Sequence, residues 1–243
     1  MVMIPKRIIF TIANNLEEKH KPFLQSFIDF NPEYEIMIFN NQQQNDFIKK
    51  NYFEFYEGFS KLPKFIQKSD FFRLAAVHYY GGIYCDIDIE CIKSLDSLLS
   101  HSLFYTVEEE ISLERFLREK EKGRYYNLNW NKKTFVRYGN YAFGAVQYHD
   151  FLKKHMNDII SEIDWIVSSE EEVNTDAYEY WIYNTTATDR TCRAIYTHKP
   201  ADLFTVEYPD QKVTNEDKLL YPLHFGIYGK HWCHGIWKKN QDR

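Results

Sequence analysis

The 243-residue sequence has few cysteines, no long basic run and no long apolar run, and each absence excludes a class of protein. The four cysteines, Cys85, Cys91, Cys192 and Cys233, form no CxxC pair and no disulfide-framework spacing, which fits a reducing compartment. The net charge of −5 and the lack of a cationic block argue against nucleic acid as the main partner.

Sequences that target or cross membranes are also missing. No stretch reaches the roughly 20 apolar residues that span a bilayer. Residues 1–6 lack the charged start and apolar run of a signal peptide. We therefore expect a cytoplasmic protein with at most peripheral contact at the inner membrane face.

Aromatic side chains, in contrast, are abundant, at 18% of the chain with 19 Tyr and 19 Phe. They suit the walls of a sugar site, although core packing accounts for most such residues in any protein. The length suits one large domain, with ample chain to bury a core. We therefore expect a single domain over residues 1–243.

Strand and helix patterns alternate in the first half of the chain. Residues 4–12 and 34–39 read as strands, and residues 19–30, 46–55 and 64–80 as helices. Later, residues 104–107 and 136–146 read as strands, and 108–122 and 151–167 as helices. Alternation with short links is typical of an α/β protein with a mostly parallel sheet.

The most informative stretch runs from Ser69 to Asp88. Asp70 and Arg73 share one face of the predicted helix, and Gly81-Gly82 can end it. From residue 83 onward the residues alternate, so that Tyr84, Asp86 and Asp88 point to the same side of a predicted strand through residue 89.

Two carboxylates on one face of an apolar strand repel each other unless a positive group lies between them. A divalent cation is the simplest such partner, and together with Asp70 and Arg73 it suits a metal-bridged diphosphate such as that of a nucleotide-sugar. Taken singly, an Asp-x-Asp pair is common on exposed strand ends, and an Asp–Arg pair at helical spacing is usually a solvated surface pair.

In this fixed order, residues 62–99 resemble glycosyltransferase family 32, the DXD-motif sugar transferases of capsular polysaccharide synthesis and of yeast Golgi α-1,6-mannosylation. The family is distantly similar to the glucosyltransferase domains of large clostridial toxins. Residues 4–6, 26–40 and 228–238 resemble the opening, the second unit and the ending of the family. The resemblance implies a GT-A-like fold, with a mixed, mostly parallel sheet flanked by helices. It assigns residues 1–100 to a nucleotide-sugar-binding half and 101–243 to an acceptor half with a C-terminal metal-binding tail.

The resemblance also implies a metal-dependent, retaining hexosyltransferase that uses a nucleotide-sugar, expected to be a UDP-sugar, with Mn²⁺ or Mg²⁺ as cofactor. Asp88 is expected to ligate the metal directly, and Asp86 to contact the ribose and the outer coordination sphere. His231 is the expected third ligand, with His234 as the alternative. The expected acceptor is a glycan or lipid-linked glycan of bacterial surface polysaccharide synthesis.

On the donor side, Asp70 and Arg73 are expected to hold the sugar, with Tyr84 and Trp237 also lining the donor. Asn140 resembles an asparagine that follows the DXD segment in the family. Two positions depart from the family pattern: Ile12 stands where a base-stacking tryptophan is common, and Ile236 where a serine precedes the tryptophan.

Two other functions remain open from sequence. A nucleotide-sugar or carbohydrate-binding module without turnover fits the departures at Ile12 and Ile236. A Mg²⁺-dependent phosphohydrolase also uses an Asp-x-Asp loop, but its motif normally follows the first strand, whereas Asp86-Ile87-Asp88 lies mid-chain.

Overall fold

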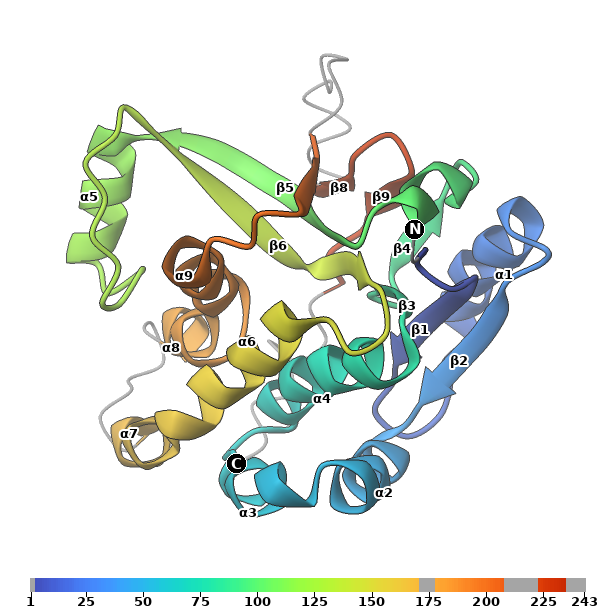
Figure 1. Ribbon diagram of the computed structural model, residues 1–243, viewed down its shortest axis with the longest axis horizontal. Helices are drawn as coiled ribbons and strands as arrows, with labels where there is room; N and C mark the ends of the chain where they lie inside the picture. The colour runs from blue at the N-terminus through green and yellow to red at the C-terminus, as the bar shows by residue number, and fades with distance from the viewer. Residues whose placement is uncertain (1–2, 171–177, 208–222, 235–243) are drawn as a thin grey trace.

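A six-stranded sheet with the order β2-β1-β3-β6-β5-β7 forms the centre of the computed structural model, which describes residues 3–170, 178–207 and 223–234 (Figure 1). Three of its neighbouring pairs are parallel, β1 with β2, β1 with β3, and β5 with β7, while β6 runs antiparallel to β3 and β5. The predicted mixed, mostly parallel sheet is confirmed. Its strands are β1 (Arg7–Thr11), β2 (Glu35–Phe39), β3 (Gly82–Cys85), β5 (Leu103–Ser112), β6 (Thr134–Ala145) and β7 (Leu203–Val206).

Both faces of this sheet are buried, as the alternation in β1 illustrates. Ile9 lies in one core with helices α4 (Phe65–Tyr80), α6 (Asp150–Ser161) and α9 (Thr188–His198). Ile8 and Phe10 lie in a second core with Phe27 of α1 (Lys21–Phe30). A strand buried on both faces reads as a continuous apolar run, as residues 8–10 do.

The glycine pair between α4 and β3 is required by backbone geometry. Gly81 has a φ of +65° and Gly82 a φ of +115°, values that side-chain-bearing residues rarely adopt. A Cβ at Gly82 would lie 2.9 Å from the carbonyl oxygen of Arg7. The pair therefore ends the helix and lets β3 enter directly beside β1.

A second, antiparallel sheet has the order β4-β9-β8, with β4 at Ile89–Cys91, β8 at Leu223–Phe225 and β9 at Gly229–His231. It packs on the large sheet where Phe225 stacks on Phe104, with ring centroids 6.1 Å apart. The segment around residue 230 therefore lies beside the segment that follows β3.

Several predicted elements differ in extent. The predicted helix 46–55 is divided at Tyr52 (φ −137°) between α2 (Asn41–Asn51) and α3 (Phe53–Lys61). The predicted helix 151–167 is likewise two helices, α6 and α7 (Ile163–Ser169), which meet at Glu162. The remaining helices are α5 (Leu113–Glu121), α8 (Tyr178–Thr185) and two short 3₁₀ turns, η1 (Glu18–His20) and η2 (Asp96–Ser100).

The prediction of a helix over residues 108–122 is wrong in its first part. Residues 108–112 extend β5 into a long hairpin with β6, and the helix α5 begins only at Leu113 (Figure 1). Arg137 of β6 pairs with Glu108 in this hairpin. This cross-strand ion pair neutralises Glu108, the first residue of the predicted helix.

Within the described residues, no helix is both long and apolar enough to cross a bilayer. The single domain over residues 1–243, divided near residue 100, stays a prediction.

Candidate active site

The Asp86-Ile87-Asp88 segment is a turn between the two sheets. β3 ends at Cys85, and the amide of Asp86 donates to the carbonyl oxygen of Tyr141 (2.8 Å). The amide of Ile89 donates to the carbonyl oxygen of Asp86 (3.1 Å), which closes the turn. The prediction of one strand through residue 89 is therefore wrong. The chain changes partners here, because β3 pairs with β6 whereas β4 pairs with β9.

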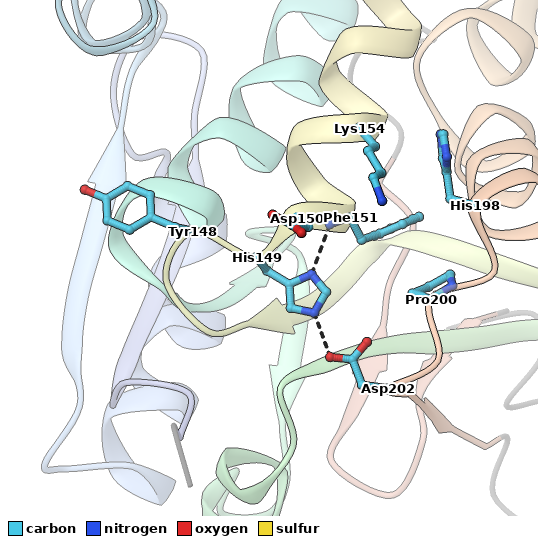
Figure 2. Close-up of a pocket in the computed structure, with 8 residues that line it drawn as sticks. All are labelled: Tyr148, His149, Asp150, Phe151, Lys154, His198, Pro200 and Asp202. Carbon is cyan, nitrogen blue, oxygen red and sulfur yellow. Dashed lines mark hydrogen bonds and ion pairs between the residues drawn. The ribbon is translucent and has the colours of Figure 1, made fainter.

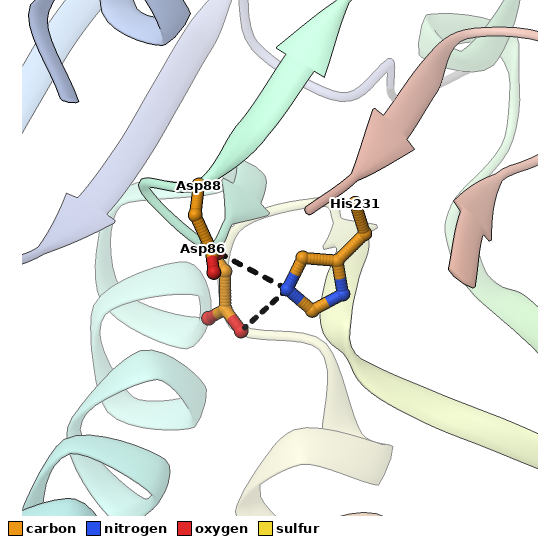
Figure 3. Close-up of side chains that lie close together, drawn as sticks. All are labelled: Asp86, Asp88 and His231. Atoms are coloured by element: carbon orange, nitrogen blue, oxygen red, sulfur yellow. Dashed lines mark hydrogen bonds and ion pairs between the residues drawn. The ribbon is translucent and has the colours of Figure 1, made fainter. Parts of the chain in front are cut away.

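The turn brings both carboxylates to one imidazole. Nε2 of His231 lies 3.0 Å from Oδ1 of Asp88 and 3.8 Å from Oδ2 of Asp86 (Figure 3). One ligand atom from each of the three residues lies within 4.8 Å of the others. The three residues that the sequence analysis proposed as metal-binding thus lie together.

His231 is held in place by the small sheet. It pairs with Ile89 of β4, and the next amide, that of Trp232, donates to the carbonyl oxygen of Asp88 (3.0 Å). His234 reaches Asp88 through its backbone instead, its amide donating to Oδ2 (2.7 Å) while its ring stacks on His20. Of the two candidate histidines, His231 is therefore the one that presents a ring nitrogen to both carboxylates.

The charges of this cluster are strongly coupled. Burial by itself raises the pKa of Asp88, but the imidazole of His231 and the amide of His234 outweigh it and hold the pKa well below its usual range. Burial lowers the pKa of His231, and the carboxylate of Asp88 more than offsets this, so the pKa lies well above the ordinary histidine value. Asp88 and His231 therefore form an ion pair of a carboxylate and an imidazolium.

The donor set fits a divalent cation. Two carboxylates and one imidazole suit Mn²⁺, and Mg²⁺ accepts the oxygens, with water or phosphate oxygens completing either shell. Nδ1 of His231 is buried and makes no hydrogen bond to the described residues. A cation bound at Nε2 would displace the proton of the ring, because metal ligands must be deprotonated.

Arg73 connects helix α4 to the turn. Its guanidinium lies 3.0 Å from Asp70 and 3.3 Å from Asp86, and it donates to the carbonyl oxygen of Asn140 (2.8 Å). Its Cζ lies 4.5 Å from the ring centroid of Tyr84. Arg73 is 4% exposed, so it acts as a buried cation between two carboxylates.

Tyr84 orients the carboxylate of Asp86 through a hydrogen bond. The ring is fully buried, and its hydroxyl donates to Oδ1 of Asp86 (2.7 Å). Because that proton is used, Thr11 is the donor in the 2.9 Å contact between its hydroxyl and that of Tyr84. Thr11 ends β1, so the carboxyl ends of β1 and β3 meet at this cluster.

Asp70 is enclosed by hydrogen-bond donors. Asn140 donates to Oδ1 (2.9 Å), Thr186 donates to Oδ2 (2.8 Å), and Arg73 pairs with Oδ1. Burial raises the pKa of Asp70 to about 6, with Arg73, Thr186 and Asn140 opposing the rise. Arg73 links this carboxylate to that of Asp86.

Thr186 is not among the site residues expected from the sequence, which gave most of residues 104–189 no role. The signal lies in the run Asn184-Thr185-Thr186-Ala187-Thr188-Asp189, five polar residues of six. All six side chains are buried at the turn between α8 and α9. Buried polar residues in sequence must each find a partner, and such a run indicates a network.

The sequence also singled out three other positions, Ile12, Ile236 and Trp237. Ile12 follows β1, where its amide donates to the carbonyl oxygen of Phe39 (3.0 Å). Trp237 and Ile236 lie outside the described residues.

A cavity of about 330 Å³ lies at the opposite end of the sheet and is separate from this cluster (Figure 2). His149 lines it, and its Nε2 donates to a carboxylate oxygen of Asp202 at 2.9 Å. The cavity and the cluster lie at opposite ends of β3. Ala145, the last residue of β6, pairs with Gly82 at the start of β3, and His149 follows shortly after it. Asp86 instead follows Cys85, the last residue of β3.

Residues 17–105 match the family model described as a glycosyltransferase sugar-binding region containing a DXD motif. The chain is 34% identical over 99 residues to inositol phosphoceramide mannosyltransferase 3 of Schizosaccharomyces pombe, which covers 40% of this chain and 28% of that protein. It is 32% identical over 150 residues to the uncharacterized glycosyltransferase L373 of Acanthamoeba polyphaga mimivirus, covering 60% of this chain and 50% of that protein.

A third relative is the initiation-specific alpha-1,6-mannosyltransferase of Candida albicans, 31% identical over 106 residues, covering 40% of this chain and 28% of that protein. The chain thus spans half or less of the length of these three relatives. Among solved structures, the PaToxG glycosyltransferase superposes with a TM-score of 0.53 at 19% identity, covering 82% of this chain and 71% of that chain. At this identity the likeness concerns the fold, and the predicted GT-A-like fold is confirmed.

Proposed function

We propose that this chain is a glycosyltransferase of the DXD-motif type, whose sugar-binding region matches residues 17–105, and that it transfers a hexose from a nucleotide-sugar in a reaction that depends on Mn²⁺ or Mg²⁺. The observation that carries the proposal is the convergence of Asp86, Asp88 and His231 within 4.8 Å, although Asp88 and His231 are 143 positions apart in the sequence.

The chemistry of the reaction explains why such a cluster is needed. Transfer breaks the bond between the anomeric carbon and a phosphate oxygen, and the departing diphosphate gains negative charge. A divalent cation held at this cluster would supply the compensating positive charge as a Lewis acid. We propose that Asp88 and His231 hold this cation, and that Asp86 lies beside it and contacts the ribose.

The buried cation Arg73 would contribute to the same charge balance. It lies 3.3 Å from Asp86, so it limits the repulsion between the aspartates and adds positive charge beside the departing phosphate. In the described fold its terminal nitrogens are engaged by Asp70, Asp86 and the carbonyl oxygen of Asn140. We therefore propose that Arg73 and Asp70 act as a pair in binding the donor sugar, with the ring of Tyr84 packed against the guanidinium.

A UDP-sugar is the proposed donor, and retention of anomeric configuration the proposed outcome, both taken from the family resemblance. For the acceptor, two of the relatives are named for mannosyl transfer, one to inositol phosphoceramide and one in α-1,6 linkage. These names favour a glycan or lipid-linked acceptor. We further propose that the chain reaches it by peripheral contact with a membrane from the cytoplasm. The relatives reported above come from two fungi and a virus, so they lend no support to a bacterial surface polysaccharide.

The test is a screen of UDP- and GDP-sugars for hydrolysis with and without Mn²⁺, on the wild-type chain and Asp88→Asn. We expect slow release of the diphosphate from one donor, stimulated by Mn²⁺ and lost in the variant. Tight UDP binding without any turnover would instead identify a binding module. Phosphate release from a simple phosphomonoester, without activity on nucleotide-sugars, would identify a phosphohydrolase.

A further inference from the structure

The turn between α8 and α9 lies against helix α4 and presents two consecutive buried threonines to it. Thr185 accepts a hydrogen bond from the side chain of Gln67 (2.9 Å). Thr186 donates to Oδ2 of Asp70 (2.8 Å). Each threonine is 1% exposed, so neither hydroxyl exchanges its partner for bulk water.

The two oxygens of Asp70 are not equivalent. Oδ1 accepts from Asn140 and pairs with Arg73, whereas Thr186 supplies the hydrogen bond to Oδ2. Three donors around one carboxylate favour its ionised form, because a protonated oxygen would face a donor with a second hydrogen. Thr186 thus opposes the burial that raises the pKa of this group.

Orientation follows from the same contacts. A carboxylate held at one oxygen only can turn about its χ2 bond, which is a broad torsion. The contact at Oδ2 fixes the plane of the carboxylate and keeps Oδ1 facing the guanidinium of Arg73, 3.0 Å away. Arg73 in turn faces Asp86.

We propose that Thr186 is a positioning residue of the donor site, which fixes the carboxylate of Asp70 and, through it, the guanidinium of Arg73. This inference rests on the proposed function, since it assigns Thr186 to the same donor site. It places a functional residue outside the family-matched region 17–105, on the turn that joins two helices of the acceptor half.

The chain offers a matched control for the test. Thr186→Val removes the hydroxyl that reaches Asp70, and Thr185→Val removes its neighbour's hydroxyl, which reaches Gln67 instead. Thr186→Ser keeps the hydroxyl and serves as the rescue. All three substitutions are made in the 243-residue chain, and the two valine substitutions conserve side-chain volume, so a general loss of packing affects these two alike.

We expect Thr186→Val to lower kcat/KM for donor hydrolysis by about 10- to 100-fold, the range for losing a hydrogen bond to a charged group. Thr185→Val and Thr186→Ser should stay within about threefold of the wild type. The acid limb of the pH profile should move to higher pH in Thr186→Val alone, because loss of a donor raises the pKa of Asp70. Equal losses in Thr186→Val and Thr185→Val, or an unmoved acid limb, would overturn the proposal.

A second readout needs no turnover and therefore separates this inference from the proposed function. The melting temperature of each variant is compared with the wild type at pH 5 and pH 7.5. The deficit of Thr186→Val should be larger at pH 7.5, where Asp70 is ionised, while that of Thr185→Val should be the same at both. If no donor is turned over, the proposed function fails, and this comparison alone decides whether Thr186 holds the ionised carboxylate. A deficit of Thr186→Val that does not change with pH would contradict it.

Discussion

Asp88 and His231 are separated by 143 positions in the sequence, yet Nε2 of His231 lies 3.0 Å from a carboxylate oxygen of Asp88. The contact is made by the small sheet, in which Ile89 pairs with His231. The register of β4 with β9 therefore brings His231 to Asp86 and Asp88, and a slip by one residue would turn the imidazole to the other face of the sheet.

The first prediction concerns Asp88 as a ligand. Asp88→Asn should reduce Mn²⁺-dependent donor hydrolysis by at least about 100-fold, because the amide loses the negative charge that binds a hard cation. Asp29→Asn is the control, since Asp29 is exposed on α1 and accepts a hydrogen bond from Gln25. Equal activity of Asp88→Asn and Asp29→Asn would rule out Asp88 as the ligand.

The second prediction tests whether His231 binds the metal or only forms an ion pair with an aspartate, as His198 does. His231→Ala should weaken Mn²⁺ binding in the presence of UDP by about tenfold or more, measured by calorimetry. His198→Ala should not change it, although His198 also pairs with an aspartate, Asp158, at 2.8 Å. An unchanged Mn²⁺ affinity of His231→Ala would show that another residue is the third ligand.

The third prediction uses the burial of Arg73. Arg73→Met leaves two carboxylates without their cation and should cost about 3–5 kcal/mol of the free energy of unfolding. Arg7→Met, which breaks the more exposed pair with Glu35, should cost less than about 1 kcal/mol. Urea titration at pH 7 measures both, and similar costs for the two variants would show that Arg73 is not a buried charge.

The fourth prediction is a pH dependence of stability. The folded-state pKa of Asp70 is raised from 3.8 to about 6, so the folded state binds this proton more tightly than the unfolded chain. The stability it contributes is present at low pH and is lost as the pH rises from about 4 through 6. A shift of about two pKa units corresponds to about 3 kcal/mol.

Asp70→Asn should therefore lose less stability than the wild type between pH 4 and pH 7, by about this amount. Urea titrations at several pH values give the comparison, and Asp29→Asn should retain the wild-type slope. Parallel curves for the wild type and Asp70→Asn would show that Asp70 titrates normally.

The sequence was sufficient for the local part of the site. Asp70, Arg73, Asp86 and Asp88 come from one continuous stretch, and helical spacing together with the glycine pair predicts their proximity. The strand through residue 89 was wrong, because the alternation of side chains continues across a point where the backbone changes sheets. Local periodicity does not record which strand pairs with which.

The non-local part depended on different information. His231 was expected as a ligand because residues 228–238 resemble the ending of the family. Its pairing with Ile89 in the small sheet could not be inferred from the sequence. The polar run 184–189 hints at a buried network, but it does not identify the partner of Thr186, because that depends on which helix the turn faces. Its partner Asp70 lies 116 positions away.

The most direct measurement is an anomalous diffraction map of crystals grown with UDP and Mn²⁺. We predict one manganese peak within about 2.0–2.4 Å of an Asp88 carboxylate oxygen and of Nε2 of His231, with a diphosphate oxygen also bound. Bound UDP with no manganese peak at these two residues, or with manganese held elsewhere, would contradict the assignment of this cluster as the metal site of the transferase.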